Sequence, residues 1–291
     1  MLECGTTNTE PVQTVQRTAA RFDPRRIYTV ILLIPLLYLA IRFLPPLVFT
    51  GIVAVIGVAA LYEFYALCFG DTRAPWNVAA GLTVCAALIA GPLMPDIVTP
   101  ALLFGLMAVF SVPLFIDTPL RDSLKHSSFT ITGLLYIGLT LSYLVMTRLL
   151  PEGEWLIIFL LLVTWAGDTG AYYVGTLCGQ RALAPRISPK KTTEGLIGGL
   201  AFATVAAFLA RWWFLPALSS LDCVMLALLL TGAGLWGDLA ESAIKRSAGV
   251  KDSGVLLPGH GGMLDRIDSL LFTAPGFYYY VTWLGHVGSQ P

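Results

Sequence analysis

Long apolar runs separated by short polar connections dominate this chain of 291 residues. A helix needs about 20 apolar residues to cross the bilayer core, so the pattern predicts an all-α, polytopic integral membrane protein with about nine transmembrane helices. Proline and glycine interrupt the runs where connections are expected, as at Pro45 and Pro151. The predicted spans are residues 27–44, 47–69, 76–93, 97–116, 128–150, 155–178, 195–215, 221–240 and 269–286.

The composition also points to lipid as the main solvent. Hydrophobic residues make up 56% of the chain and charged residues 12%, which is about half the charged share of a soluble domain. This excludes an ordinary soluble enzyme and a disordered protein. The net formal charge is zero, so nothing in the overall charge suggests a nucleic acid as partner. The five cysteines form no CxxC pair, which argues against a disulfide framework or a thiolate zinc site.

The distribution of basic residues predicts the orientation of the chain. We treat residues 1–26 as a polar cytosolic tail and the first helix as retained rather than cleaved as a signal peptide. Alternating sides from there places 15 of the 18 Lys and Arg residues on the inner side, as expected for cytosolic segments. The exceptions are Arg42, Arg148 and Arg211. We divide the remainder into N-terminal transmembrane helices, 27–150, and a C-terminal transmembrane catalytic region, 151–291.

Charged residues are densest in the segment 238–268, where nine of 31 residues carry a charge. Asp238 and Glu241 are three positions apart and would share one face if the preceding helix continues past the membrane surface. Asp265 and Asp268 have the same spacing at the start of the last apolar run. Two facing carboxylate clusters suit a hard divalent cation, and Mg²⁺ completes its shell with phosphate oxygens and water. We therefore expect a magnesium and phosphate site here.

The same segment supplies positive charge and a flexible backbone. Its basic residues are Lys245, Arg246, Lys251 and Arg266, which are suitable counter-charges for phosphate. The run Pro258–Gly262 contains three glycines around His260, so its backbone N–H groups can approach an anion closely. These features favour a functional loop over a cytosolic connection whose charges only pair among themselves.

A second polar segment, residues 188–195, precedes another apolar run. It combines hydroxyl groups, two lysines and the expected N-terminus of a helix, which together make an anion site. Asp168 is a third feature, because an ionisable group within an apolar run is costly and indicates function. Its neighbours Gly167 and Gly170 would let another helix approach closely. Glu63 is a weaker case, and we expect it near the inner headgroup boundary.

The segment 242–268 resembles the signature of the phosphatidate cytidylyltransferases, the CDP-diacylglycerol synthases. The matching residues are Ser242-Ala243-Ile244-Lys245-Arg246, Lys251-Asp252-Ser253-Gly254 and Leu257 through Asp268. Residues 165–172 and 188–195 also look like family segments, although Thr193 stands where an aromatic residue is expected. The resemblance is strong over about residues 160–270, whereas the N-terminal half resembles the family only as a multi-span hydrophobic pattern.

This resemblance implies that CTP and phosphatidate react to CDP-diacylglycerol and pyrophosphate in phospholipid biosynthesis, with Mg²⁺ as cofactor. The implied metal ligands are Asp238 and Asp265, assisted by Asp268 and Glu241, with Asp168 as a further metal or structural ligand. The implied catalytic residues are Lys245, Arg246, Lys251, His260 and Arg266. The implied substrate-binding residues are Ser188, Lys190, Lys191, Thr192, Glu194, Ser242, Gly261 and Gly262.

Membrane lipids are further expected partners, and the bacterial inner membrane is the expected location, with the N-terminus and the active site in the cytosol. Small residues on several helices also permit a homodimer. Two alternatives stay open at this point. A cation-coupled transporter would use Glu63 and Asp168 as a path, but we find no inverted repeat. A related CTP-dependent enzyme would act on another lipid with similar headgroup chemistry.

Overall fold

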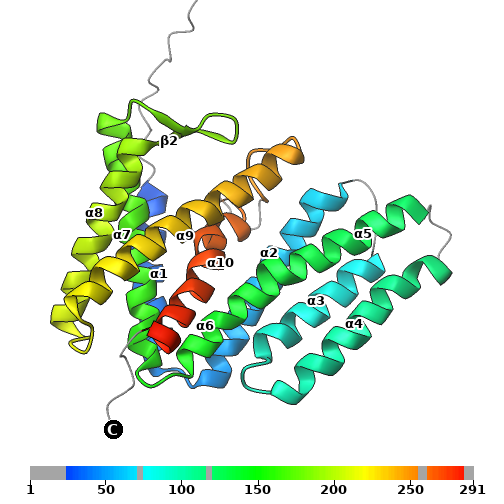
Figure 1. Ribbon diagram of the computed structural model, residues 1–291. Coiled ribbons are helices and arrows are strands. Elements are labelled where there is room, and N and C mark those ends of the chain that lie inside the picture. Colours follow the sequence, from blue (N-terminus) through cyan, green and yellow to red (C-terminus); the bar gives the residue numbers. More distant parts are fainter. Residues whose placement is uncertain (1–23, 71–74, 116–119, 255–260, 285–291) are drawn as a thin grey trace, which may run out of the picture.

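The computed structural model describes residues 24–70, 75–115, 120–254 and 261–284, and it is mostly helical (Figure 1). The helices of the first half are α1 (Pro24–Phe43), α2 (Pro46–Phe69), α3 (Pro75–Ala90), α4 (Pro95–Phe115), α5 (Leu120–Gly133), the π-helical η1 (Leu134–Leu139) and α6 (Thr140–Arg148). Those of the second half are α7 (Gly153–Cys178), α8 (Thr193–Trp213), α9 (Ser220–Ser247), α10 (Leu264–Tyr279) and the π-helical η2 (Tyr280–Leu284).

Helices cover all nine apolar runs predicted from the sequence, within the residues described. The helices long and apolar enough to cross a membrane are Pro46–Phe69, Arg121–Arg148, Gly153–Cys178, Thr193–Trp213 and Ser220–Ser247. The chain is therefore an integral membrane protein by length and composition of its helices. The full count of nine spans stays a prediction. The helix α9 continues to Ser247, seven residues past the predicted end of its span at residue 240.

A small antiparallel hairpin departs from the purely helical fold that we predicted. Its strands are β1 (Ala182–Ala184) and β2 (Ser188–Thr192), paired from Ala182 with Thr192 to Ala184 with Ser188. This segment is polar, and Pro185 and Pro189 oppose a helix. The hairpin connects α7 to α8 and projects from their ends (Figure 1).

Glycines allow α7 and α8 to pack closely. A Cβ on Gly199 would lie 2.9 Å from the carbonyl oxygen of Gly167, and one on Gly170 would lie 2.8 Å from that of Gly198. Both separations are too short for an ordinary Cβ contact, so small residues on both helices are required. The expected close helix approach is confirmed at Gly170, whereas a Cβ on Gly167 would lie at an ordinary 3.6 Å from Cβ of Ala203.

The helix α10 lies at the centre of the fold. It packs against α9 and α7 of the second half and against α2 and α6 of the first (Figure 1). Its contact with α9 is especially close at Gly237, where a Cβ would clash with the backbone carbonyl oxygen of Asp268 and stand 3.2 Å from Cα of Ser269. The glycine therefore sets the distance between the two helices that carry the acidic residues.

The two ends of the bundle differ in their charges. The end where α9 finishes and α10 begins also holds the hairpin and the last turns of α2. The opposite end carries the three basic residues predicted to lie outside, Arg42, Arg148 and Arg211. Each has a local partner: the first lies 5.2 Å above the ring of Trp155, the second pairs with Glu154 at 3.2 Å, and the third donates to Ser220 at 2.8 Å. Each of these three arginines is therefore stabilised by a group of the protein itself, so its charge does not indicate a substrate site at this end.

We expect Gly237→Ala to lower the free energy of unfolding by about 1–3 kcal/mol, because the methyl group forces α9 away from α10. The matched control is Gly232→Ala on the same helix, where a Cβ meets no atom within 4 Å. This control should leave stability unchanged or raise it by about 0.5–1 kcal/mol. Melting temperatures of the purified variants in detergent check the prediction, and equal values for both would contradict it.

Candidate active site

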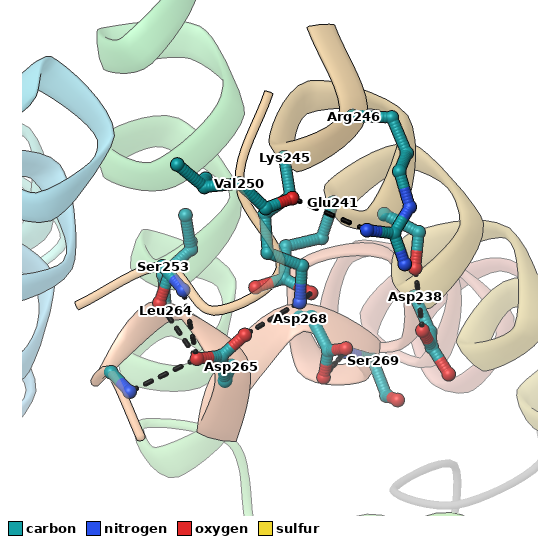
Figure 2. A network of polar contacts seen from close by, with 12 residues as sticks. Asp238, Glu241, Lys245, Arg246, Val250, Ser253, Leu264, Asp265, Asp268 and Ser269 are labelled. Carbon is teal, nitrogen blue, oxygen red and sulfur yellow. Dashed lines mark hydrogen bonds and ion pairs between the residues drawn. The ribbon is translucent and has the colours of Figure 1, made fainter. Parts of the chain in front are cut away.

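Three carboxylates from two helices converge at the end of the bundle. Asp238 and Glu241 lie one turn apart on α9, and Asp268 faces them from the second turn of α10 (Figure 2). One carboxylate oxygen of each residue lies within 4.8 Å of the others. The structure thus brings together three of the five residues predicted as metal ligands. We refer to Asp238, Glu241 and Asp268 as the acidic triad.

The surroundings of the acidic triad favour a bound cation. Burial and the neighbouring charge of Asp238 raise the pKa of Asp268 to about 7. The Oε1 atom of Glu241 is buried and has no hydrogen-bond partner among the described residues. A hard cation would bind the unpartnered oxygen of Glu241 and offset the negative charge of Asp268, because carboxylate oxygens are the ligands that Mg²⁺ selects in proteins. The donor set therefore fits a magnesium ion.

Two lysines form ion pairs with members of the acidic triad. Lys191 on strand β2 pairs with Asp238 at 2.5 Å, which is how the hairpin contacts the site. Lys245 on α9 lies 2.6 Å from both Glu241 and Asp265 (Figure 2). Both ammonium groups are mostly buried. These ion pairs hold both ammonium groups beside the acidic triad, where they are suitable counter-charges for phosphate oxygens once a cation has bound the carboxylates.

Asp265 lies outside the acidic triad, although the sequence analysis made it a principal metal ligand. Its Oδ1 contacts Lys245, and its Oδ2 accepts hydrogen bonds from the amides of Ser253 and Gly262 and from the hydroxyl of Ser253, at 2.9–3.1 Å. Burial alone would raise its pKa, but the contacts with Glu241, Lys245 and these amides hold it well below its usual range. Asp265 therefore organises the loop before α10.

Other predicted metal and catalytic residues are spread around this centre. Asp168 on α7 accepts a long hydrogen bond of 3.5 Å from Ser269, the residue after Asp268. Arg246 is exposed and donates to the carbonyl of Val250 at 3.3 Å. Exposed positions are also occupied by Lys251 and Arg266. His260 lies outside the described residues.

The predicted substrate-binding residues divide into capping groups and residues near the site. Thr192 caps α8 by accepting from the amide of Gly195 at 3.1 Å. Glu194 accepts from the amides of Gln180 and Arg181, so both residues stabilise the base of the hairpin. Ser188 and Lys190 belong to strand β2.

Two of the predicted substrate-binding residues lie closer to the carboxylates. Ser242 contacts Asp238 at 3.4 Å, and the amide of Gly262 binds Asp265. Gly261 has φ of +80°, a conformation that glycine adopts without strain.

The N-terminal half contributes residues that the sequence analysis missed or set aside. Tyr136 in η1 has a buried hydroxyl without a hydrogen-bond partner among the described residues, and it stacks edge-on against Phe272 of α10. The sequence feature that could have indicated Tyr136 is a polar hydroxyl group in the interior of an apolar run. Glu63 also reaches the site region, through contacts described below.

Comparison with known proteins places this arrangement in a family. Residues 24–284 match the sequence model of the Cytidylyltransferase family. The chain belongs to the Cytidylyltransferase family. That match covers both halves, whereas the sequence analysis found a specific resemblance over about residues 160–270 alone.

Several relatives support this membership. The chain is 43% identical over 146 residues to the phosphatidate cytidylyltransferase of Bacillus subtilis (strain 168), covering 50% of this chain and 54% of the relative. It is 41% identical over 155 residues to that of Staphylococcus saprophyticus, covering 53% and 59%. The uncharacterized protein YnbB of Escherichia coli (strain K12) is 46% identical over 137 residues, covering 47% and 46%. The chain thus spans about half the length of these curated relatives.

We expect Asp265→Asn to lower the free energy of unfolding by about 2 kcal/mol at neutral pH, because the amide loses charge-assisted hydrogen bonds. Asp265 has a folded pKa below its ordinary value of 3.8. Its stabilisation is therefore complete above that value and lost as pH falls below it. The gap in melting temperature between wild type and variant should stay constant above about pH 5 and shrink below about pH 4. A gap that persists unchanged in acid would contradict this role.

Proposed function

We propose that this chain transfers the cytidylyl group of CTP to phosphatidate, giving CDP-diacylglycerol and pyrophosphate for phospholipid biosynthesis. The observation that carries the proposal is the acidic triad, bordered by Lys191 and Lys245 at one end of an apolar helical bundle. Family membership and relatives named phosphatidate cytidylyltransferase support it.

The position of the site suits two substrates of opposite solubility. Phosphatidate is anchored in the bilayer by its acyl chains, whereas CTP is a water-soluble anion. A site at the end of the bundle, on helices α9 and α10 that emerge from the apolar region, is accessible from both phases. The hairpin adds Lys191 from the water-exposed side.

In the proposed reaction a phosphate oxygen of phosphatidate attacks the α-phosphorus of CTP. The new oxygen–phosphorus bond forms as the bond to the β-phosphate oxygen breaks, and pyrophosphate leaves with the electron pair. The attacking oxygen is already ionised near neutral pH, so no strong general base is required. The main barrier is the repulsion between two anions, which Lys191 and Lys245 lower by charge and the loop around Asp265 lowers by positioning.

We propose that Asp238, Glu241 and Asp268 hold Mg²⁺. The ion, when bound, supplies the positive charge that polarises phosphate oxygens. Asp268 takes the place that the sequence analysis gave to Asp265, whose oxygens bind Lys245 and the preceding loop. Asp168 supports Ser269 next to the triad.

We further propose nine spans, with the N-terminus and the active site in the cytosol of a bacterial inner membrane. The support is the excess of basic residues at the site end and the bacterial relatives. Membrane lipids surround the bundle under this proposal, and a homodimer stays a prediction. The transporter alternative loses its basis, because Glu63 and Asp168 bind different partners instead of forming one path.

The function is tested by CTP-dependent release of pyrophosphate from phosphatidate in mixed micelles, using the purified full-length chain. Parallel reactions replace CTP with dCTP or ATP and phosphatidate with a polyprenyl phosphate. Turnover with CTP and phosphatidate is expected. Turnover with the polyprenyl phosphate alone would reassign the lipid substrate, and ion flux through vesicles without any turnover would favour a transporter.

We expect Asp238→Asn and Asp268→Asn each to reduce kcat about 100-fold, the scale on which one electrostatic contact to a transition state acts. Both should also need more Mg²⁺ for half-maximal rate, because each loses one anionic ligand. The matched control is Asp96→Asn, an exposed carboxylate in the first turn of α4, which should keep the wild-type rate. A triad variant with wild-type kcat and Mg²⁺ requirement would remove that residue from the site.

A further inference from the structure

Glu63 is a buried carboxylate that the proposed reaction does not use. It lies on α2, and only 4% of it is exposed. Its hydrogen-bond partner Leu264 follows it by 201 positions in the chain. A charged group at such a site requires compensating contacts, since removing it from water is costly. The partners of Glu63 therefore indicate why it is there.

Those partners all belong to the loop that leads into α10. The Oε2 atom of Glu63 accepts a hydrogen bond of 2.9 Å from the amide of Leu264 and one of 3.2 Å from the hydroxyl of Ser253. Leu264 is the first residue of α10, and the residue before it, Met263, provides no side-chain cap. The first amides of a helix lack partners within the helix and favour a nearby negative charge. Glu63 thus caps α10 from another helix.

The loop also fits closely around the carboxylate. A Cβ on Gly254 would stand 2.7 Å from Oε1 of Glu63, and one on Gly262 would stand 2.5 Å from Oε2. Neither position has room for a larger residue without displacing Glu63. Both flanks of the loop are therefore fixed against this one side chain of the N-terminal half.

A continuous series of contacts joins Glu63 to the acidic triad. Ser253, which binds Glu63, also donates to Asp265 at 2.9 Å. Asp265 contacts Lys245, and Lys245 contacts Glu241 of the triad (Figure 2). Asp268 is one turn further along the helix that Glu63 caps. A shift of the start of α10 would therefore move Asp268 relative to α9.

We propose that Glu63 is a positioning residue for cytidylyl transfer, which fixes the start of α10 and so the separation of Asp268 from Asp238 and Glu241. This inference rests on the proposed function. It assigns to the N-terminal half a role in the geometry of the site, since α2 holds both flanks of the loop through Glu63. Misplacement of a reacting geometry by about 1 Å costs on the order of 100-fold in rate.

The test compares Glu63→Ala and Glu63→Gln in the full-length chain. The alanine variant removes the Oε2 atom that accepts both hydrogen bonds, so kcat should fall about 10- to 100-fold, the scale known for residues that orient a metal site. The KM for CTP should stay within about threefold, because the nucleotide contacts remain. The glutamine oxygen can still accept from Leu264, so this variant should recover kcat to within about fivefold of wild type.

A second readout follows the hydrogen bond itself. The amide of Leu264 should exchange its proton with solvent at least about tenfold faster in Glu63→Ala than in wild type, because its acceptor is gone. Ser253→Ala is a milder variant that removes the hydroxyl shared by Glu63 and Asp265, leaves the bond from the Leu264 amide to Glu63, and keeps the test possible if Glu63→Ala fails to fold. It should show a smaller loss of kcat, about fivefold to tenfold.

The matched control is Asp222→Asn. Asp222 is also a buried carboxylate, 6% exposed, with hydrogen bonds from the amide of Ser219 and the hydroxyl of Tyr280 at 2.8 Å, but it lies at the opposite end of α9. This variant should lower the melting temperature and keep kcat within twofold. A comparable loss of kcat in this control, wild-type kcat in Glu63→Ala, or a glutamine variant as inactive as the alanine variant would each overturn the inference. A wild-type chain without cytidylyl transfer would instead overturn the proposed function, and the exchange of the Leu264 amide would still report the contact.

Discussion

The site depends on the close approach of α9 and α10. The absence of a side chain at Gly237 lets the backbone of Asp268 lie directly against α9. This contact brings a carboxylate of one helix to the two of the other, against their mutual repulsion. Packing supplies the free energy that holds these like charges together. A cation is then the natural completion of a geometry that the helices impose.

The carboxylates around this contact form two groups, the acidic triad and Asp265, which differ in how their oxygens are bound. The acidic triad leaves Oε1 of Glu241 without a partner among the described residues, which is suitable for binding an ion. Asp265, by contrast, has both oxygens engaged by Lys245 and the loop before α10. Asp265 thus has both oxygens occupied, whereas Glu241 keeps one oxygen without a partner among the described residues. Lys245 links the two groups, because it contacts both Glu241 of the triad and Asp265.

Much of this architecture was predictable from local patterns. The apolar runs gave the helices, and the spacing of Asp238, Glu241 and Lys245 anticipated a shared face on an extended α9. The same reasoning did not separate Asp265 from Asp268, because both have helical spacing and only the packing of α10 decides which one joins Asp238 and Glu241 and which one binds Lys245. The hairpin depends on pairing between strands, and Tyr136 becomes relevant through the turn of η1. Glu63 meets its partners across about 200 residues, a contact that no local pattern reveals.

The arginine contacts at the far end bear on how the chain enters the bilayer. Under the proposed orientation, the connection between α6 and α7 must be moved across the membrane, a step that positive charge opposes. Arg148 forms its ion pair with Glu154, only six positions along the chain. The translocated turn therefore carries a charge and its counterion together. Because Arg148 is only 7% exposed, a counterion this close also offsets the cost of burying its guanidinium group.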